Sequence, residues 1–388
     1  MPGFEVFGDE ELAAIVDLFK QNGGIVFAHG FDAVRNGIYK VREYERAFAT
    51  RLGSKYAQAV SSGSAALKVG LDALGVGPGD EVITQAFTFV ATVEAIRETG
   101  ATPIIVDIDE TLGMNAGALE AAITKRTKAV IPVHMMGEAV DMDPILAVAR
   151  SHNIAILEDA AQSLGASYKG KNTGTLGDVG AFSTDAGKTL NTGEGGVVIT
   201  DDEEVFIRAR GAHDHGHEYS KTLGRGEEGA VGPGFNYRMT ELQGAIGLVQ
   251  LSKMAHIIKR QRANKAALME RLRDLPVRFR RSPDPEGDIS DTIVMYMPDR
   301  KRAVEVVAAM REAKIGTKNL PDAARWHFAK YWDHLFKGHP LYEGRNQSWL
   351  ASDEILARAV AIPVMVKVDT DRLDFLGEKL SEIGRKYL

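Results

Sequence analysis

The chain has 388 residues, of which 44% are hydrophobic and 26% charged, with a formal net charge of -6 and no cysteine. This length exceeds what one hydrophobic core usually fills, so we expect a large domain and a smaller one. The absence of cysteine excludes disulfides, thiolate nucleophiles and cysteine-ligated metals, and the acidic balance argues against a nucleic-acid-binding surface.

The N-terminal stretch MPGFEVFGDEEL is acidic and lacks the basic start and apolar core of a signal peptide. The sequence also contains no apolar run of about 18 residues, the length that a membrane-spanning helix needs. We therefore expect a cytoplasmic protein that binds neither membranes nor nucleic acid.

Between about residues 55 and 200, short apolar runs alternate with amphipathic segments. The runs are AQAV, EVITQ, PIIVDID, AVIPVH, IAILED, VGAFS and VVIT. This alternation predicts an α/β fold with a mostly parallel central sheet flanked by helices. The segment SAALKVGLDALG, for example, repeats its apolar residues at helical spacing, and Gly75 follows as a terminator.

Residues 239–275 contain no proline and keep helical spacing, which predicts one long helix, or two nearly continuous ones, leaving the large domain. Turn residues at 282–288 (SPDPEGD) then mark a smaller α+β domain. The chain ends in an amphipathic helix for which Thr370 is the expected cap. We therefore expect a large domain over residues 1–270, with an N-terminal segment lining the substrate site, and a small domain over residues 271–388.

The stretch FSTDAGKTLNTGEGG carries a single amine, Lys188, among small residues. A lysine that acts as a nucleophile needs close backbone, little water and a bonding partner. Asp159 ends the strand IAILED, where open α/β sheets place ligands, although a carboxylate there also suits a helix cap. A strand-end acid and a downstream lysine fit pyridoxal phosphate chemistry, because the lysine forms a Schiff base with the cofactor aldehyde and the acid keeps the pyridine nitrogen protonated.

A phosphate site is predicted where SSGSAAL follows a strand and opens a helix, because free N–H groups and the positive helix end face an anion there. Ser64 adds a hydroxyl, and Ser183 is a second phosphate donor. Helix-start and turn roles are the structural alternatives for these serines. Phe87 and Phe89 lie at a strand-to-helix junction, where one of them stacks on a flat cofactor or both belong to the core.

Four motifs occur in order over nearly the whole chain: GDEVITQAFTFVAT, EDAAQSLGA, FSTDAGKTLNTGEGG and GFNYRMTELQGAIGLVQL. Together they resemble the DegT/DnrJ/StrS family of pyridoxal phosphate-dependent aminotransferases, fold type I enzymes that mostly act on keto sugars. The resemblance implies that Lys188 binds the cofactor aldehyde and carries the proton between substrate and cofactor. It also implies that Asp159 pairs with the pyridinium nitrogen.

The same resemblance assigns further cofactor contacts. Gln162 would lie near the ring oxygen of the cofactor and Phe89 would stack on its face. The phosphate would be held by Ser64, Ala65 and Ser183.

The resemblance also implies a homodimer with composite active sites. Asn236 would reach the phosphate in the neighbouring subunit, with Arg238 in the same shared region. Family dehydratases carry histidine at the position of Lys188, so the lysine in this chain argues against that branch. Where the family usually reads FSFH this chain reads FSTD, so Asp185 either orients the lysine or is a turn acid.

The long lead FAHGFDAVRNGIYKVREYE, with HDHGH, SPDPEGD and ARWHFAKYWDHL, resembles the branch that aminates C8 of 3-deoxy-octulosonate (Kdo), the 8-amino-3,8-dideoxy-manno-octulosonate transaminases. This implies L-glutamate as donor, 8-oxo-Kdo as acceptor and a role in lipopolysaccharide synthesis. Arg35 and His327 are then candidates for the acceptor's carboxylate and hydroxyls. The alternatives are a surface-loop arginine and a packed histidine.

Alternating histidines in HDHGH suggest a metal site, but no carboxylate pattern completes a set of ligands. We therefore expect no metal, and we place His215 and His217 near the mouth of the site, on polar substrate groups.

The predicted reaction takes the amino group of L-glutamate, leaving pyridoxamine phosphate, and passes it to a keto or aldehyde sugar. Competing hypotheses are a family aminotransferase for a nucleotide-linked keto sugar or scyllo-inosose, and a non-catalytic pyridoxal phosphate-binding regulator.

Overall fold

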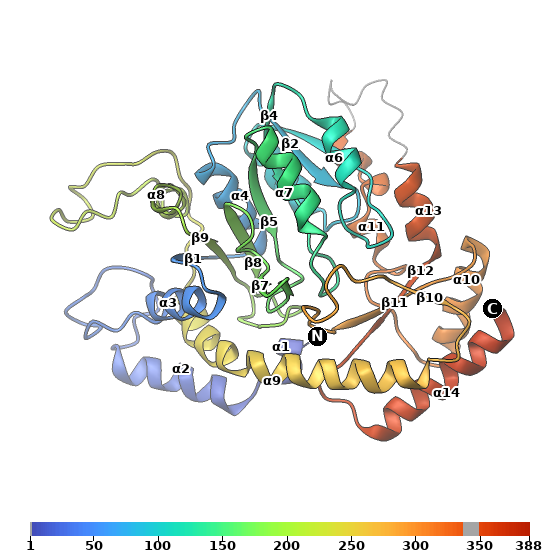
Figure 1. Ribbon diagram of the computed structural model, residues 1–388. Helices are drawn as coiled ribbons and strands as arrows, with labels where there is room; N and C mark the ends of the chain where they lie inside the picture. Colours follow the sequence, from blue (N-terminus) through green and yellow to red (C-terminus); the bar gives the residue numbers. More distant parts are fainter. Residues whose placement is uncertain (1, 337–348) are drawn as a thin grey trace.

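The computed structural model describes residues 2–336 and 349–388. Its centre is a seven-stranded sheet in the order β1-β9-β8-β5-β4-β2-β3 (Figure 1). The strands are β1 (Tyr56–Val60), β2 (Glu81–Gln85), β3 (Thr102–Val106), β4 (Thr127–Ile131), β5 (Ala155–Asp159), β8 (Val179–Ser183) and β9 (Gly196–Thr200). Strand β9 pairs antiparallel with both neighbours and the other pairs are parallel, which confirms the predicted mostly parallel sheet.

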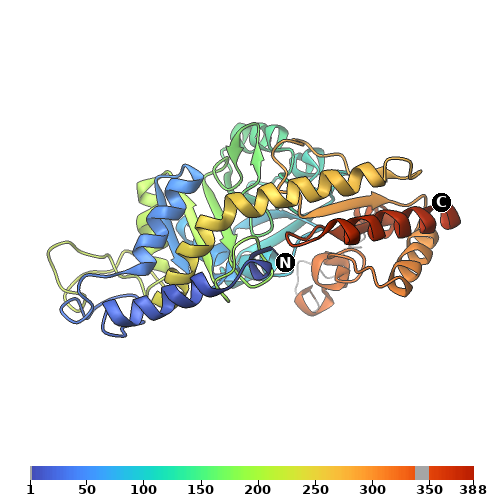
Figure 2. The same cartoon turned by 90° about the horizontal axis from the view of Figure 1, so that it is seen from below.

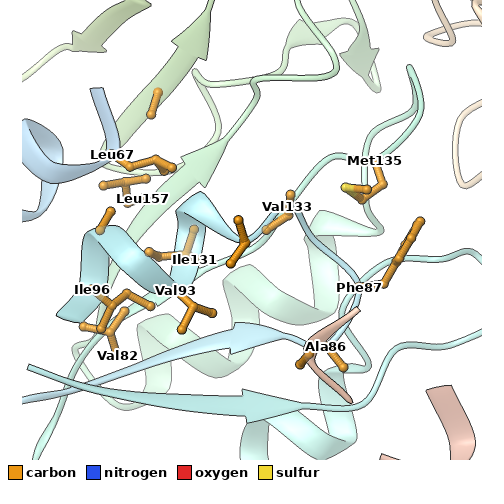
Figure 3. Packing of buried hydrophobic residues seen from close by; sticks show 14 of the residues in the cluster. Leu67, Val82, Ala86, Phe87, Val93, Ile96, Ile131, Val133, Met135 and Leu157 are labelled. Carbon is orange, nitrogen blue, oxygen red and sulfur yellow. The ribbon is translucent and has the colours of Figure 1, made fainter. Parts of the chain in front are cut away.

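Helices cover both faces of this sheet. On one face lie α4 (Gly63–Ala73), α5 (Ala91–Glu98) and α8 (Glu203–Ala212), and on the other α6 (Ala116–Ala122) and α7 (Met142–Ser151). Figure 3 shows Leu67, Val93 and Ile96 packed against side chains of β2, β4 and β5. Because both faces are apolar and covered, the polar ends of the strands are where a site can open.

Helix α9 (Glu241–Arg271) confirms the prediction of one long helix. It packs against α2 (Asp9–Gln21) and α3 (Lys40–Leu52), with the short α1 (Pro2–Glu5) nearby, and continues to the small sheet (Figure 2). Gly244 and Gly247 permit the close approach of α3, since an added Cβ would lie 2.6 Å from the Val41 nitrogen and 2.8 Å from the Tyr44 ring, respectively.

The small antiparallel sheet consists of β10 (Arg278–Phe279), β11 (Thr292–Tyr296) and β12 (Ala359–Pro363), with α10 (Arg300–Glu312) and α14 (Thr370–Tyr387) packed on it. It has its own apolar core, which includes Ile293 and Val360, but Phe328 and Trp332 of the same C-terminal part join the core of the central sheet. The division at residue 270 therefore stays a prediction.

The cap of α14 differs from the prediction. Asp369, in extended conformation, accepts a hydrogen bond from the Arg372 N–H at 2.8 Å, so it is the N-cap, and Thr370 is the first helical residue. The short elements are β6 (Ser167–Tyr168), β7 (Lys171–Asn172), α11 (Ala324–His327), η1 (Ala329–Tyr331), α12 (Asp333–Phe336) and α13 (Leu350–Arg358). None of the helices in the described part of the chain has the length and apolar character needed to cross a membrane.

Candidate active site

A cavity of about 720 Å³ opens where β5 and β8 end. One wall comes from the central sheet and its loops, and another from the small sheet and the segment before α11. The predicted site residues that line it are Ser64, Phe89, Asp159, Gln162, Ser183, Asp185, Lys188 and His327.

Asp159 is almost completely buried at the end of β5, with 4% of its surface exposed. Its Oδ2 accepts a hydrogen bond from the Thr92 hydroxyl at 2.7 Å, and its Oδ1 accepts one from the Ala161 N–H at 3.2 Å. Burial raises the pKa of this carboxyl above its ordinary value, against the effect of these hydrogen bonds. A cationic ring nitrogen placed against Asp159 would therefore be the partner that keeps it ionised.

Lys188 lies in the loop between β8 and β9, with its amine 3.7 Å from Asp185 Oδ2. Asp185 also accepts the Gly187 N–H through Oδ1 at 2.6 Å, so it is a turn acid and a neighbour of the lysine at once. The N-terminal segment supports this loop, because the Gly3 N–H donates to the Lys188 carbonyl at 3.0 Å. A Cβ added to Gly3 would lie only 2.7 Å from the Asn191 nitrogen.

The start of α4 meets the end of β8 at the cavity. A Cβ added to Gly63 would lie 2.6 Å from Ser183 Cβ, so glycine is what lets the helix start approach this strand. Ser62 caps the helix by accepting the Ala65 N–H at 3.0 Å. Ser64 and Ser183 line the cavity, whereas Ala65 has its N–H engaged in the cap and lines a neighbouring cavity.

The two aromatic residues of the strand-to-helix junction separate. Phe87 is fully buried, while Phe89 is 43% exposed and lines the cavity, 5.3 Å from the His327 ring between centroids. Nδ1 of His327 lies 2.9 Å from the Ala323 carbonyl, to which it donates, and burial lowers the pKa of His327 below its ordinary value. The neutral ring thus keeps Nε2 as an acceptor.

Arg35 does not reach this cavity. It is fully buried, with Nη2 3.2 Å from Glu241 and Nε donating to the Ile38 carbonyl at 2.9 Å. The alternative of a surface-loop arginine is therefore wrong, and the guanidinium is also engaged away from the cavity. The sequence could not reveal this, because Glu241 begins a helix far along the chain.

The segment between α8 and α9 projects from the sheet (Figure 1), and in it Arg238 forms an isolated bridge with Val60 and Asn236 one with Asp214. The Arg238 guanidinium pairs with Asp214, a buried carboxylate that also binds Arg225 at 2.6 Å. Asn236 is exposed. Neither residue is among the described residues that line the cavity within one copy of the chain.

The HDHGH histidines have separate neighbours. His213 is buried against Gln58, His215 is exposed beside Phe235, and His217 Nδ1 lies 2.8 Å from Glu228. Over residues 2–336 and 349–388, no three histidine or acidic side chains gather as metal ligands do. His215 and His217 do not line the cavity of the described chain either.

Several cavity residues were missed from the sequence. Thr92, Asp291, Lys318 and Asn319 all line the cavity, and Asn319 donates to Gln162 Oε1 at 3.1 Å. Thr92 reads as an ordinary helix-start residue, and IGTKNLP reads as a turn. Thr92 reaches Asp159 from α5, whereas only the packing of the small sheet against the central one brings Asp291, Lys318 and Asn319 to the cavity.

The arrangement fits pyridoxal phosphate. Asp159 offers a buried acid for the ring nitrogen, Lys188 an amine for the aldehyde, and Phe89 an aromatic face. The start of α4, with Ser64 and Ser183 beside it, offers N–H groups and hydroxyls to the phosphate.

Comparisons with known proteins agree with this chemistry. The model of the DegT/DnrJ/EryC1/StrS aminotransferase family matches residues 31–381. A protein named GDP-perosamine synthase, from Caulobacter vibrioides, is 46% identical over 222 residues, which cover 57% of this chain and 58% of the relative. The spore coat polysaccharide biosynthesis protein SpsC of Bacillus subtilis is 41% identical over 360 residues, 89% of each chain.

Solved structures give the same result. An aminotransferase from Psychrobacter cryohalolentis superimposes with a TM-score of 0.86 at 25% identity, covering 98% of each chain. DesV of S. venezuelae superimposes with a TM-score of 0.81 at 27% identity, covering 97% of this chain and 94% of its own. The chain therefore belongs to the DegT/DnrJ/EryC1/StrS aminotransferase family and is a pyridoxal phosphate-dependent aminotransferase.

Proposed function

We propose that this enzyme moves the amino group of L-glutamate to a keto sugar carried on a nucleotide. The observation that supports the proposal is that the amine of Lys188 and the buried acid Asp159 line the same cavity. A sugar acceptor is supported by the 46% identity to a relative named for a GDP-linked sugar.

In the proposed reaction each residue of the cavity has a separate role. When bound, pyridoxal phosphate supplies an electron-accepting ring and a carbonyl that takes up the amino group. Lys188 Nζ removes the proton from the donor carbon and later delivers a proton to the sugar carbon. Asp159 retains the proton on the ring nitrogen, Phe89 packs on the ring face, and Ser64 and Ser183 hold the phosphate.

The preference for a nucleotide-linked acceptor over 8-oxo-Kdo follows from Arg35. The octulosonate hypothesis used Arg35 as the partner of the acceptor's carboxylate, and that guanidinium is buried against Glu241. His327, with a free acceptor nitrogen in the cavity, remains a candidate for a sugar hydroxyl. We therefore place 8-oxo-Kdo second and include it in the test.

We also propose a homodimer whose partner subunit supplies Asn236 and Arg238. Support comes from apolar side chains that face water in one copy: Phe235 is 65% exposed, Phe31 58% and Leu12 60%. Large apolar side chains that face water in one copy are what an interface between two copies would cover. Light scattering after gel filtration tests this, and Phe235→Glu should shift the protein toward monomer.

The experiment for the reaction uses the cofactor's absorbance. L-glutamate is added to the loaded enzyme, the amino acid is removed, and a GDP-linked keto sugar or 8-oxo-Kdo is supplied separately. Recovery of the original absorbance with the nucleotide sugar supports the proposal. Recovery with 8-oxo-Kdo alone would restore the octulosonate hypothesis, and no change with L-glutamate would remove it as the donor.

A further inference from the structure

We propose that Lys318 binds the α-carboxylate of the amino donor, an inference that rests on the proposed transamination of an amino acid. Every α-amino acid carries this carboxylate on the carbon that loses its proton. The cavity must therefore present a hydrogen-bond donor, and preferably a cation, close to the reacting centre.

The charges on the cavity wall leave Lys318 as the available cation. Among the described residues that line the cavity, the basic side chains are Lys188, Lys318 and His327. Lys188 is committed to the cofactor, and burial keeps His327 neutral by lowering its pKa. The acidic side chains that line the cavity, Asp159, Asp185, Glu194 and Asp291, repel a carboxylate.

Lys318 is also held in place. Its backbone N–H donates to the Ala361 carbonyl of β12 at 2.9 Å, and its ammonium pairs with Asp291. Burial favours the neutral form of Asp291, but the Lys318 charge, the hydrogen bonds from Lys318 and Thr292 and the Lys265 charge together outweigh it and hold the pKa of Asp291 below its ordinary value. The Asp291 Oδ1 accepts the Thr292 hydroxyl at 2.7 Å, so this carboxylate is anchored on both oxygens.

The ammonium keeps capacity for a ligand. A lysine has three N–H donors, and the pair with Asp291 uses one of them. The Lys318 side chain is 25% exposed in the wall of the cavity. A second carboxylate can therefore bind the same ammonium while Asp291 keeps it oriented.

Lys318 lies near the reacting groups, although it comes from the other wall of the cavity. The positive charges of both Lys188 and Lys318 act on the His327 ring, in addition to its burial. The next residue, Asn319, donates to Gln162, which follows Asp159 by three positions on the central wall. A carboxylate attached directly to the reacting carbon fits this placement, whereas the carboxylate of a long sugar acid lies several bonds from its reacting end.

The test is the half-reaction with donor alone, followed by the cofactor's absorbance. Lys318→Met should raise the half-saturating concentration of L-glutamate about 10- to 100-fold, the usual worth of one charge-assisted hydrogen bond. The same substitution should leave 4-aminobutyrate, which lacks the α-carboxylate, as poor a donor as it is for the wild type. Lys318→Arg should recover part of the L-glutamate affinity, and Lys301→Met, on the 81% exposed Lys301, is the matched control.

An unchanged half-saturation for L-glutamate in Lys318→Met would overturn the inference, as would equal weakening of L-glutamate and 4-aminobutyrate. If the single variant fails to fold because Asp291 is left unpaired, the double variant Asp291→Asn/Lys318→Met carries the same expectation without the buried charge. Failure of the proposed function is recognised separately, because the wild type itself would then not react with any amino acid.

Discussion

The residues that line the cavity and those of the projecting region use charged side chains in opposite ways. The projecting region is defined as residues 22–39 and 213–238. In the cavity wall, Asp159 and Lys318 each have a partner and still face open space. In the projecting region, Arg238 pairs with Asp214 and His217 with Glu228, while Arg35 turns back to Glu241 of α9. A charged side chain is a candidate ligand for substrate only when its partners within the protein leave it a hydrogen-bonding group that faces the cavity.

The difference has a topological cause. Parallel strands end at one edge of a sheet, so side chains that follow β5 and β8 converge without further help. The projecting region has long loops between α2 and α3 and after α8, and its polar groups must satisfy one another before they can serve a substrate.

The largest effect is expected at Lys188 in the cavity wall. Lys188→Ala should lower turnover by at least about 10³-fold, because it removes the group that moves the proton in the proposed reaction. The unfolding midpoint should stay close to that of the wild type. Lys221→Ala, an exposed lysine of the projecting region, is the control, and a comparable loss there would break the comparison.

Arg35 tests the structural side of the comparison. Arg35→Met leaves Glu241 buried without its cation and should destabilise the fold by about 3–5 kcal/mol in urea unfolding. The double variant Arg35→Met/Glu241→Gln should recover much of this. If stability is unchanged and the acceptor's KM rises instead, Arg35 would be a substrate ligand after all.

The burial of His213 predicts how the stability of the folded protein depends on pH. Burial lowers its pKa to about 4, against an ordinary value near 6.5, so it is neutral when folded. The unfolded chain binds the proton more tightly, and stability is therefore full above about pH 6.5 and falls as the pH drops toward 4. Relative to His213→Gln, the wild type should lose about 2–3 kcal/mol more between pH 7 and about pH 4.5. Parallel curves for the two proteins would contradict this.

Thr92 gives the smallest expected effect. Thr92→Val removes the hydroxyl that binds Asp159 and should lower turnover about tenfold. Because that hydrogen bond holds the Asp159 pKa down, the acidic limb of the pH profile should also move to higher pH. Thr99→Val, at the end of the same helix, is the control. A loss equal at every pH would mean that Thr92 only supports the packing.

Local pattern was enough for the central sheet and for the meeting of Lys188 and Asp159 in one cavity. The runs EVITQ and VGAFS coincide with β2 and β8, and Lys188 and Asp159 meet in one cavity because strand ends leave little choice. Pattern failed at the α14 cap, which was predicted at Thr370 and is Asp369, because either side chain can cap and only the backbone conformation decides.

The sequence by itself determined the fold class, the family and the pairing of an amine with a strand-end acid, because periodicity and motif order are local properties. The tertiary structure decided which side chains face the cavity. It buried Arg35 against Glu241, separated Phe89 from Phe87, and brought Lys318 across from Lys188. These depend on contacts between segments far apart in the chain, which no local pattern records.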